Sequence, residues 1–238
     1  MPAPTPSPHG LPDVRCLGGL PAVRPDGSTG RTVPGRVLRG PAHALLGTGA
    51  GAALRSAGIA TVVDLRSPGE GDRSAHDGVT VLQRPVEDPQ DAEFQRDFGP
   101  DLGSPRYYRE IVRRWPNLLA EAVAAVARAP RGGVLVHCAA GRDRTGQVSA
   151  LLLALVGVPA EAVADQDEQA RRDANTYLST HPRPHEVALD DGDLDRELAA
   201  ARTELIGFLR AVDLPEALLA AGLTEADVAA LQDRLLTP

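Results

Sequence analysis

Lysine is absent from this chain of 238 residues, and aromatic side chains make up only 3% of it. All 25 basic residues are therefore arginines. Because a guanidinium stays charged and presents its donors in a planar fork, every cationic site here must bind anions in that geometry. The scarcity of aromatics means that aliphatic side chains must fill the core, and the abundance of alanine and leucine favours helix.

Cysteine is nearly absent as well: Cys16 and Cys138 are the two thiols, and they lie far apart in the sequence. Two thiols do not make a disulfide framework, which predicts a reducing compartment, the cytoplasm. The N-terminal stretch has no apolar segment typical of a secretory signal peptide, which leaves export by another route open. No apolar run is long enough to span a bilayer. The net charge of −7 argues against nucleic acid as a partner.

Segments rich in apolar and β-branched residues alternate with segments of helical spacing. The expected strands are 36–39, 59–67, 78–86 and 133–137. The expected helices are 41–58, 104–130 and 145–157, with Pro116 breaking or kinking the second, and 87–103 is expected as an acidic loop. This alternation predicts an α/β fold with a mainly parallel central sheet flanked by helices.

The two ends of the chain differ from this alternating region. Residues 1–12 are rich in proline and are predicted to be disordered. Residues 13–238 are expected to form a single domain. Residues 160–238 have helical patterns except for a predicted loop at 179–193, so an all-helical C-terminal part should cover one face of the sheet or form a cap.

The stretch HCAAGRDRTG, residues 137–146, is where the sequence points to chemistry. An apolar strand ends at His137-Cys138, and a strongly apolar helix is expected from Thr145. A short loop between a strand and a helix N-terminus presents backbone N–H groups and the helix dipole to a bound anion. The expected phosphate site consists of Ala139, Ala140, Gly141, Arg142, Arg144 and Thr145, and its glycine permits the tight turn.

Cys138 is expected at the floor of this site as the nucleophile. The amides, the dipole and Arg144 should favour its thiolate form at neutral pH. Arg144 can clamp two phosphate oxygens and stabilise the charge that develops on them. Thr145 can donate a hydrogen bond to the sulfur, and His137 can orient the loop. Taken singly, these residues could equally be a small buried cysteine, a helix cap and a surface ion pair.

Asp143 is the best candidate for protonating the leaving group. Its alternative role is that of an N-cap for the following helix, and both roles could hold together. Asp64 and Arg66, at the end of a neighbouring strand, are expected to form an ion pair that braces the loop. Neither a metal nor a cofactor is expected, and HPRPH at 181–185 is interpreted as a proline-rich loop rather than a metal site.

The stretch 137–146 resembles the HCxxGxxR(S/T) signature of the cysteine-based protein tyrosine phosphatases. Two further stretches, GIATVVDLRSPGE at 58–70 and VRCLGGLPAVRPDG at 14–27, are similar to segments of the bacterial tyrosine/serine phosphatase branch. Arg142 stands where that branch usually has lysine, and Cys16 stands where it usually has aspartate.

The resemblance implies a tyrosine-phosphatase-like fold in which residues within 165–212 form a helical lid. It also implies hydrolysis of phosphomonoesters through a phosphocysteine, with phosphotyrosine as substrate and phosphoserine, phosphothreonine or phosphoinositides as further candidates. The partner would then be a phosphorylated protein or a phosphoinositide.

Two other classes of function stay open at this point. One is a catalytically weak module that binds phosphorylated ligands on the same fold. The other is arsenate reduction or sulfur transfer, which would need a resolving cysteine, and Cys16 is the only candidate. Cys16 is first interpreted as part of a structural turn, with a protective disulfide to Cys138 as the alternative.

Overall fold

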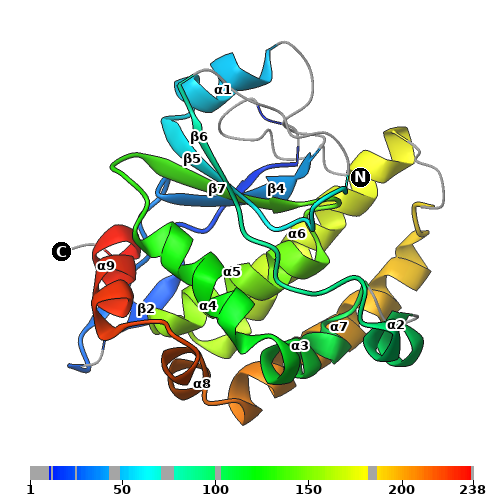
Figure 1. The fold of residues 1–238 in the computed structure, drawn as a ribbon. Coiled ribbons are helices and arrows are strands. Elements are labelled where there is room, and N and C mark those ends of the chain that lie inside the picture. Colours follow the sequence, from blue (N-terminus) through cyan, green and yellow to red (C-terminus); the bar gives the residue numbers. More distant parts are fainter. Residues whose placement is uncertain are drawn as a thin grey trace.

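A five-stranded sheet forms the centre of the protein in the computed structural model (Figure 1). The structure describes residues 11, 13–24, 26–42, 49–70, 78–99, 103–181 and 187–236. In spatial order, the strands are β1 (Arg15–Cys16), β4 (Val37–Pro41), β7 (Gly133–Cys138), β5 (Ile59–Asp64) and β6 (Thr80–Gln83). All neighbours pair in parallel except β1, which runs antiparallel to β4. The predicted α/β fold with a mainly parallel sheet is confirmed.

Helices cover both faces of this sheet (Figure 1). On one face α1 (Ala50–Ser56) packs over a small cluster that includes Val62 and Leu135. On the other face α4 (Pro116–Ala127) and α5 (Asp143–Leu155) belong to the larger core. Because β7 is covered on both sides, all its residues are buried, as expected for a continuous apolar run in a parallel sheet.

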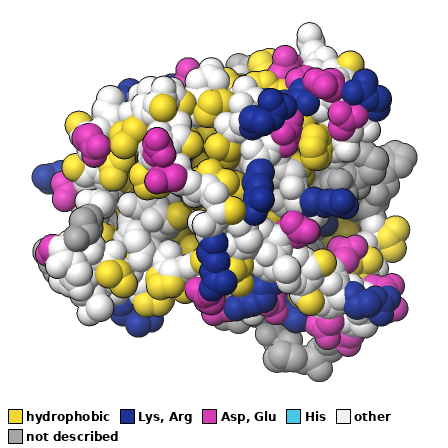
Figure 2. Space-filling view, turned by 90° about the horizontal axis from the view of Figure 1, so that it is seen from below, with side chains coloured by type: hydrophobic (Ala, Val, Ile, Leu, Met, Phe, Trp, Pro, Cys, Tyr) yellow, Lys and Arg dark blue, Asp and Glu magenta, His cyan; other side chains and the backbone are white. Residues whose placement is uncertain are grey.

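The remaining elements enclose the far side of α4 and α5. They are α2 (Ala92–Phe98), the 3₁₀ turn η3 (Pro105–Tyr107), α3 (Tyr108–Arg114), α6 (Ala160–Thr180), α7 (Asp191–Ala211), α8 (Leu214–Ala220) and α9 (Glu225–Leu235). A hairpin of β2 (Pro21–Val23) and β3 (Thr29–Arg31) turns at Asp26-Gly27. Figure 2 looks at the molecule from below, and basic and acidic side chains lie interspersed on this face.

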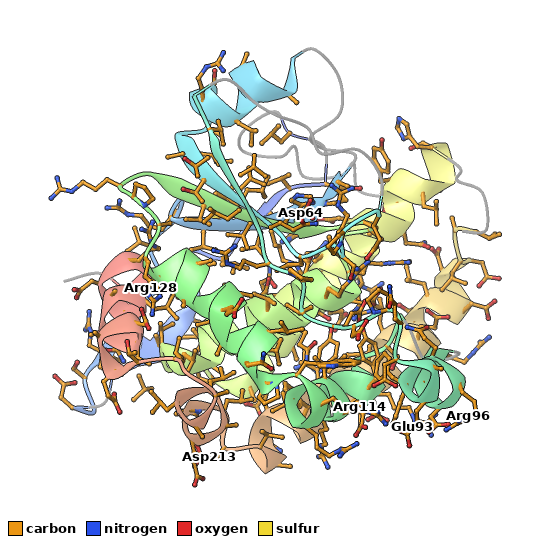
Figure 3. All side chains as sticks on the ribbon, viewed as in Figure 1. Asp64, Glu93, Arg96, Arg114, Arg128 and Asp213 are labelled. Atoms are coloured by element: carbon orange, nitrogen blue, oxygen red, sulfur yellow. The ribbon has the colours of Figure 1, made fainter. Side chains whose placement is uncertain are left out.

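Residues 87–103 contain α2, so the prediction of a continuous loop there was wrong. The Asp91 side chain accepts a hydrogen bond from the Phe94 amide at 2.9 Å and thereby caps the helix. Phe94 is fully buried, with its ring 5.0 Å from that of Trp115. Figure 3 shows Arg114 beside Glu93 where α2 meets α3. A cap and one buried aromatic therefore stabilise a helix that the acidic composition concealed.

The predicted break at Pro116 is confirmed: α3 ends at Arg114, and Pro116 is the first residue of α4. The expected helix at 41–58 is shorter, because Pro41 belongs to β4 and α1 begins at Ala50, while residues 43–48 lie outside the described residues.

The C-terminal region is helical, as predicted from residue 160 onward. The predicted loop at 179–193 is narrower, because α6 extends to Thr180 and α7 begins at Asp191, and residues 182–186 lie outside the description. The predicted disorder of 1–12 also falls almost wholly outside it. Within the described ranges, no helix combines the length and the apolar character needed to cross a bilayer.

Candidate active site

The loop at 139–142 connects the middle of the sheet directly to a buried helix. It leaves β7 at Cys138, which is 3% exposed, and enters α5 at Asp143. The register pairs Cys138 with Pro41 on β4, and His137 with Asp64 on β5. The thiol therefore lies at the carboxyl edge of parallel strands, the usual place for ligands in open α/β sheets.

Gly141 is the residue that lets this loop pass so close to β4. Its φ of +73° lies in the left-handed region. A Cβ atom at this position would lie 2.7 Å from the carbonyl carbon of Gly40 and from the nitrogen of Pro41. Both neighbours are backbone and cannot swing away, so conformation and space both require glycine here.

Arg144 projects from the first turn of α5 and is held by Glu70. Its Nη1 donates to Oε1 at 2.6 Å, and its Nη2 donates to Oε2 at 2.8 Å. Burial disfavours the charged guanidinium, but these bonds and the nearby charge of Cys138 outweigh it and raise the pKa of Arg144. The same bonds lower the pKa of Glu70 against the opposing effect of burial. Glu70 is the last residue of the quoted 58–70 stretch, and the sequence analysis gave it no role.

A second carboxyl, Glu87, faces the same guanidinium. Its Oε1 lies 3.5 Å from Nε of Arg144, and its side chain is 12% exposed. Its Oε2 is buried and has no hydrogen-bond partner among the described residues. Burial raises the pKa of Glu87, with contributions from the negative charges of Glu70 and Asp143.

The loop is braced from behind by Arg39, a residue of β4 that is 1% exposed. Its Nη2 donates to the carbonyl oxygens of Gly141 and Arg142 at 3.1 and 3.2 Å. Its Nη1 donates to Asp167 at 2.8 Å and to Gln166 at 3.0 Å. This brace was not predicted; an arginine inside the otherwise apolar strand VLRGP indicates a buried charge with a partner, but not which partner it has.

Asp143 is the first residue of α5, and the cap position belongs to Arg142, which makes no side-chain capping bond. The alternative interpretation of Asp143 as the N-cap is therefore wrong. Its Oδ1 is buried and finds no hydrogen-bond partner within the described ranges; it lies 3.7 Å from Nη1 of Arg171. Its carbonyl oxygen accepts a hydrogen bond from the Tyr108 hydroxyl at 2.8 Å.

Arg171 of α6 is only 8% exposed. It donates from Nε to Asp167 at 2.7 Å and from Nη1 to the carbonyl oxygen of Gly103 at 2.7 Å. Burial alone would raise the pKa of Asp167, but the charges of Arg171 and Arg39 outweigh burial and lower it. This network ties α6 to the back of the loop.

Asp64 and Arg66 form the predicted ion pair. Arg66 donates from Nε and Nη2 to the Asp64 carboxylate at 2.9 and 2.8 Å, and its amide donates to Oδ1 at 3.0 Å. Despite burial, these bonds lower the pKa of Asp64. Nε2 of His137 lies 3.6 Å from Asp64, while its Nδ1 lies 3.1 Å from the Cys138 carbonyl oxygen. Figure 3 shows Asp64 within the sheet layer.

The other predicted phosphate-binding residues follow the loop. Ala139 is exposed, and Ala140 and Arg142 are half-buried. Thr145 is fully buried, and its Oγ1 has no partner within the described part of the chain, so the expected bond to the Cys138 sulfur is not formed.

Cys16 belongs to a turn, as first interpreted: its sulfur accepts hydrogen bonds from the amides of Gly18 and Gly35 at 3.2 and 3.1 Å. The registers align Cys16 with Leu38 and Leu38 with Leu135. Cys16 is thus two strands across and three residues along from Cys138, roughly 14 Å away at normal strand spacings. A disulfide needs Cα atoms within about 7 Å, so the proposed pairing and the role of Cys16 as a resolving cysteine were wrong.

Comparisons with known proteins agree on one family. A family model described as "Tyrosine phosphatase family" matches residues 7–237. A putative tyrosine-protein phosphatase of Cupriavidus necator is 28% identical, with 84% of this chain and 76% of that protein aligned. The triple specificity protein phosphatase PtpB of Mycobacterium tuberculosis is 31% identical over 55% of this chain and 59% of its own length. A tyrosine-protein phosphatase of Nostoc commune is 29% identical over 59% of this chain and 48% of its own length.

Among solved structures, P. aeruginosa TpbA in complex with pTyr covers 80% of this chain and 88% of its own. Its sequence identity is 19% and its TM-score is 0.33, a likeness too distant to support an inference. The family model, in contrast, spans nearly the whole chain and includes the loop between β7 and α5. This chain belongs to the tyrosine phosphatase family.

Proposed function

We propose that this chain hydrolyses phosphomonoesters, phosphotyrosine first among them, through a phosphocysteine formed on Cys138. One observation carries the proposal: Cys138 ends the central strand, and the loop after it turns directly into the N-terminus of α5, with Arg144 in the first helical turn. The amides of 139–144 and the helix dipole would bind the phosphoryl oxygens. In this arrangement the sulfur attacks phosphorus from the floor of an anion site.

In the first step, the Cys138 thiolate forms a bond to phosphorus while the bond from phosphorus to the leaving-group oxygen breaks. The released oxygen takes a proton from Asp143, whose unbonded Oδ1 at the start of α5 supports this role. Arg144 and the loop amides balance the charge on the phosphoryl oxygens throughout.

In the second step, a water oxygen attacks phosphorus and the phosphorus–sulfur bond breaks. The Asp143 carboxylate takes a proton from that water, so the acid is regenerated, and inorganic phosphate leaves. Thr145, buried behind the loop, would donate its free hydroxyl to the departing sulfur. We also propose a supporting role for Asp64, Arg66 and His137: Arg66 holds the Asp64 carboxylate in place, and that carboxylate lies 3.6 Å from Nε2 of His137 at the end of β7.

The substrate range that we propose starts with phosphotyrosine and extends to phosphoserine, phosphothreonine and phosphoinositides. Support for a wider range comes from the M. tuberculosis relative, which is named a triple specificity phosphatase. A donor such as Asp143 matters most for alkyl esters, because an alkoxide is more basic than a phenolate, whose conjugate acid has a pKa of about 10.

We also propose that residues within 165–212 cover the site as a lid on a single domain of residues 13–238. The support is that Arg171 of α6 reaches Asp143, and that α7 packs along α6.

Hydrolysis of p-nitrophenyl phosphate by the purified protein tests the proposal. Cys138→Ser should abolish turnover while vanadate binding persists, and Cys16→Ser should retain full activity as the matched thiol control. Asp143→Asn should lower kcat by about 100-fold or more on alkyl phosphates and by much less on aryl phosphates. Full turnover by Cys138→Ser would refute the phosphocysteine route.

A further inference from the structure

The arrangement of two carboxyls around Arg144 has a consequence for anion binding. A guanidinium offers five N–H donors, which pair into an end-on edge between Nη1 and Nη2 and a side-on edge that includes Nε. Glu70 takes the end-on edge with bonds of 2.6 and 2.8 Å. With Glu70 in place, the side-on edge is where Arg144 can bind two phosphoryl oxygens.

Glu87 lies on that side-on edge. Its Oε1 is 3.5 Å from Nε, within ion-pair distance but without a hydrogen bond between them. The residue comes directly after Val86, a fully buried residue that fixes the backbone beside the sheet edge. The carboxyl is therefore placed where an incoming phosphate oxygen would have to lie.

We propose that Glu87 competes with the substrate phosphate for the Nε edge of Arg144 and so controls when the site accepts an anion. The inference rests on the proposed function, because it assigns Arg144 to the phosphoryl group. Charged Glu87 would repel a phosphate dianion and occupy its place. Neutral Glu87 would not repel the dianion and would be held less strongly by Arg144, so the phosphate could displace it, and its hydroxyl could donate a hydrogen bond to the phosphate.

The groups facing Glu87 come from three elements. Glu70 follows β5, and Asp143 and Arg144 begin α5. Tyr107 lies in η3, and its pKa is raised by burial with contributions from the charges of Asp143, Glu87 and Cys138. Among the residues that the structure describes, Arg144 is the cation that lowers the pKa of Glu87, while Glu70 and Asp143 both favour its protonated form. A bound dianion would act in the same direction, so we expect anion binding to take up a proton at Glu87.

Sulfate is the probe that separates this effect from the titration of the substrate. It remains a dianion between about pH 5 and pH 8, unlike a phosphomonoester, and the Cys138→Ser background removes the thiol from the titration. Calorimetry at a series of pH values should show sulfate affinity falling as pH rises, because the ionised form of Glu87 repels the dianion. Repulsion between a carboxylate and a nearby dianion predicts a loss of about tenfold or more.

Glu87→Gln in the same background should abolish most of that loss and bind sulfate about tenfold more tightly at the upper end of the range. The matched control is Asp88→Asn, which removes one negative charge from the adjacent, exposed position and can still accept the bond from the Gln90 amide. The sulfate affinity of this control should change with pH as it does in the Cys138→Ser protein without a second substitution. An unchanged pH dependence in Glu87→Gln would overturn the inference and leave the proposed function intact, whereas absence of sulfate binding at every pH would overturn both.

Two further readouts keep the test independent of how well one variant folds. Sulfate titrations of the Cys138→Ser protein in buffers of different ionisation enthalpy should reveal net proton uptake on the alkaline side of the affinity change, and no uptake there would contradict the inference. In steady-state hydrolysis of p-nitrophenyl phosphate, Glu87→Gln should lower KM and leave kcat within about twofold. A large loss of kcat, greater on alkyl phosphates, would instead make Glu87 the proton donor and refute the competition.

Discussion

Replacing Arg39 by methionine should destabilise the protein and disable its loop at the same time. The guanidinium is buried and makes four hydrogen bonds, two to loop carbonyls and two to α6, with Asp167 as its ionic partner. Methionine retains the apolar part of the side chain but leaves Asp167 with Arg171 as its ionic partner. The Gly141 carbonyl loses the Arg39 donor, while the Arg142 carbonyl keeps only its bond from the Gly146 amide. Removing one partner of a buried ion pair costs about 3–5 kcal/mol, and this is the loss of unfolding free energy that we expect.

Denaturant unfolding measures this loss, since a domain with about 5–15 kcal/mol of stability stays folded after it. Arg113→Met is the control, because Arg113 pairs with Glu110 at the surface with 67% of its side chain exposed, and it should change the unfolding free energy little. The folded Arg39→Met protein should also lose up to about 100-fold in kcat, because loop atoms move from their places. If Arg39→Met lost less than about 1 kcal/mol of unfolding free energy and kept its kcat, Arg39 would not stabilise the loop as we infer.

Three further outcomes follow from single contacts. Gly141→Ala should reduce kcat by about 100-fold or more, because the left-handed φ and the contact with Gly40 force the loop to move; normal activity would contradict this. Bonds from Arg113 and Arg114 lower the pKa of Glu110 from 4.5 to about 2. The difference in unfolding free energy between the wild type and Glu110→Gln should therefore be fully present above about pH 4.5 and vanish as pH falls through 2. Urea unfolding at several pH values measures this difference. Mild oxidation should give no Cys16–Cys138 crosslink on mass spectrometry, and its rapid formation in folded protein would invalidate the strand registers.

The centre of the fold and of the site could be predicted from the sequence because local signals coincide there. An apolar strand, a glycine and a helix start follow one another within 133–157. Together they predict a strand, a tight turn and a helix, because all three signals lie next to each other along the chain. Asp64 and Arg66 were predictable for the same reason, since they end an adjacent strand of the same parallel sheet.

The residues that hold the loop from a distance could not be found this way. Arg39 meets Gly141 and Asp167 only because β4 lies beside β7 and α6 crosses behind them, which no local pattern encodes. Glu70 stood in a recognised stretch, yet its bond to Arg144 depends on how the turn after β5 folds back. Helix α2 was missed because a single buried ring, not periodicity, stabilises it.

The brace behind the loop also governs when the enzyme can become active during its synthesis. Arg39 is made about a hundred residues before the loop, and its counter-ion on α6 is made after it. A ribosome that has released the chain only as far as α5 therefore holds a loop whose support from α6 is missing. The loop should reach its folded arrangement late in synthesis, once α6 has emerged and Asp167 has bound Arg39.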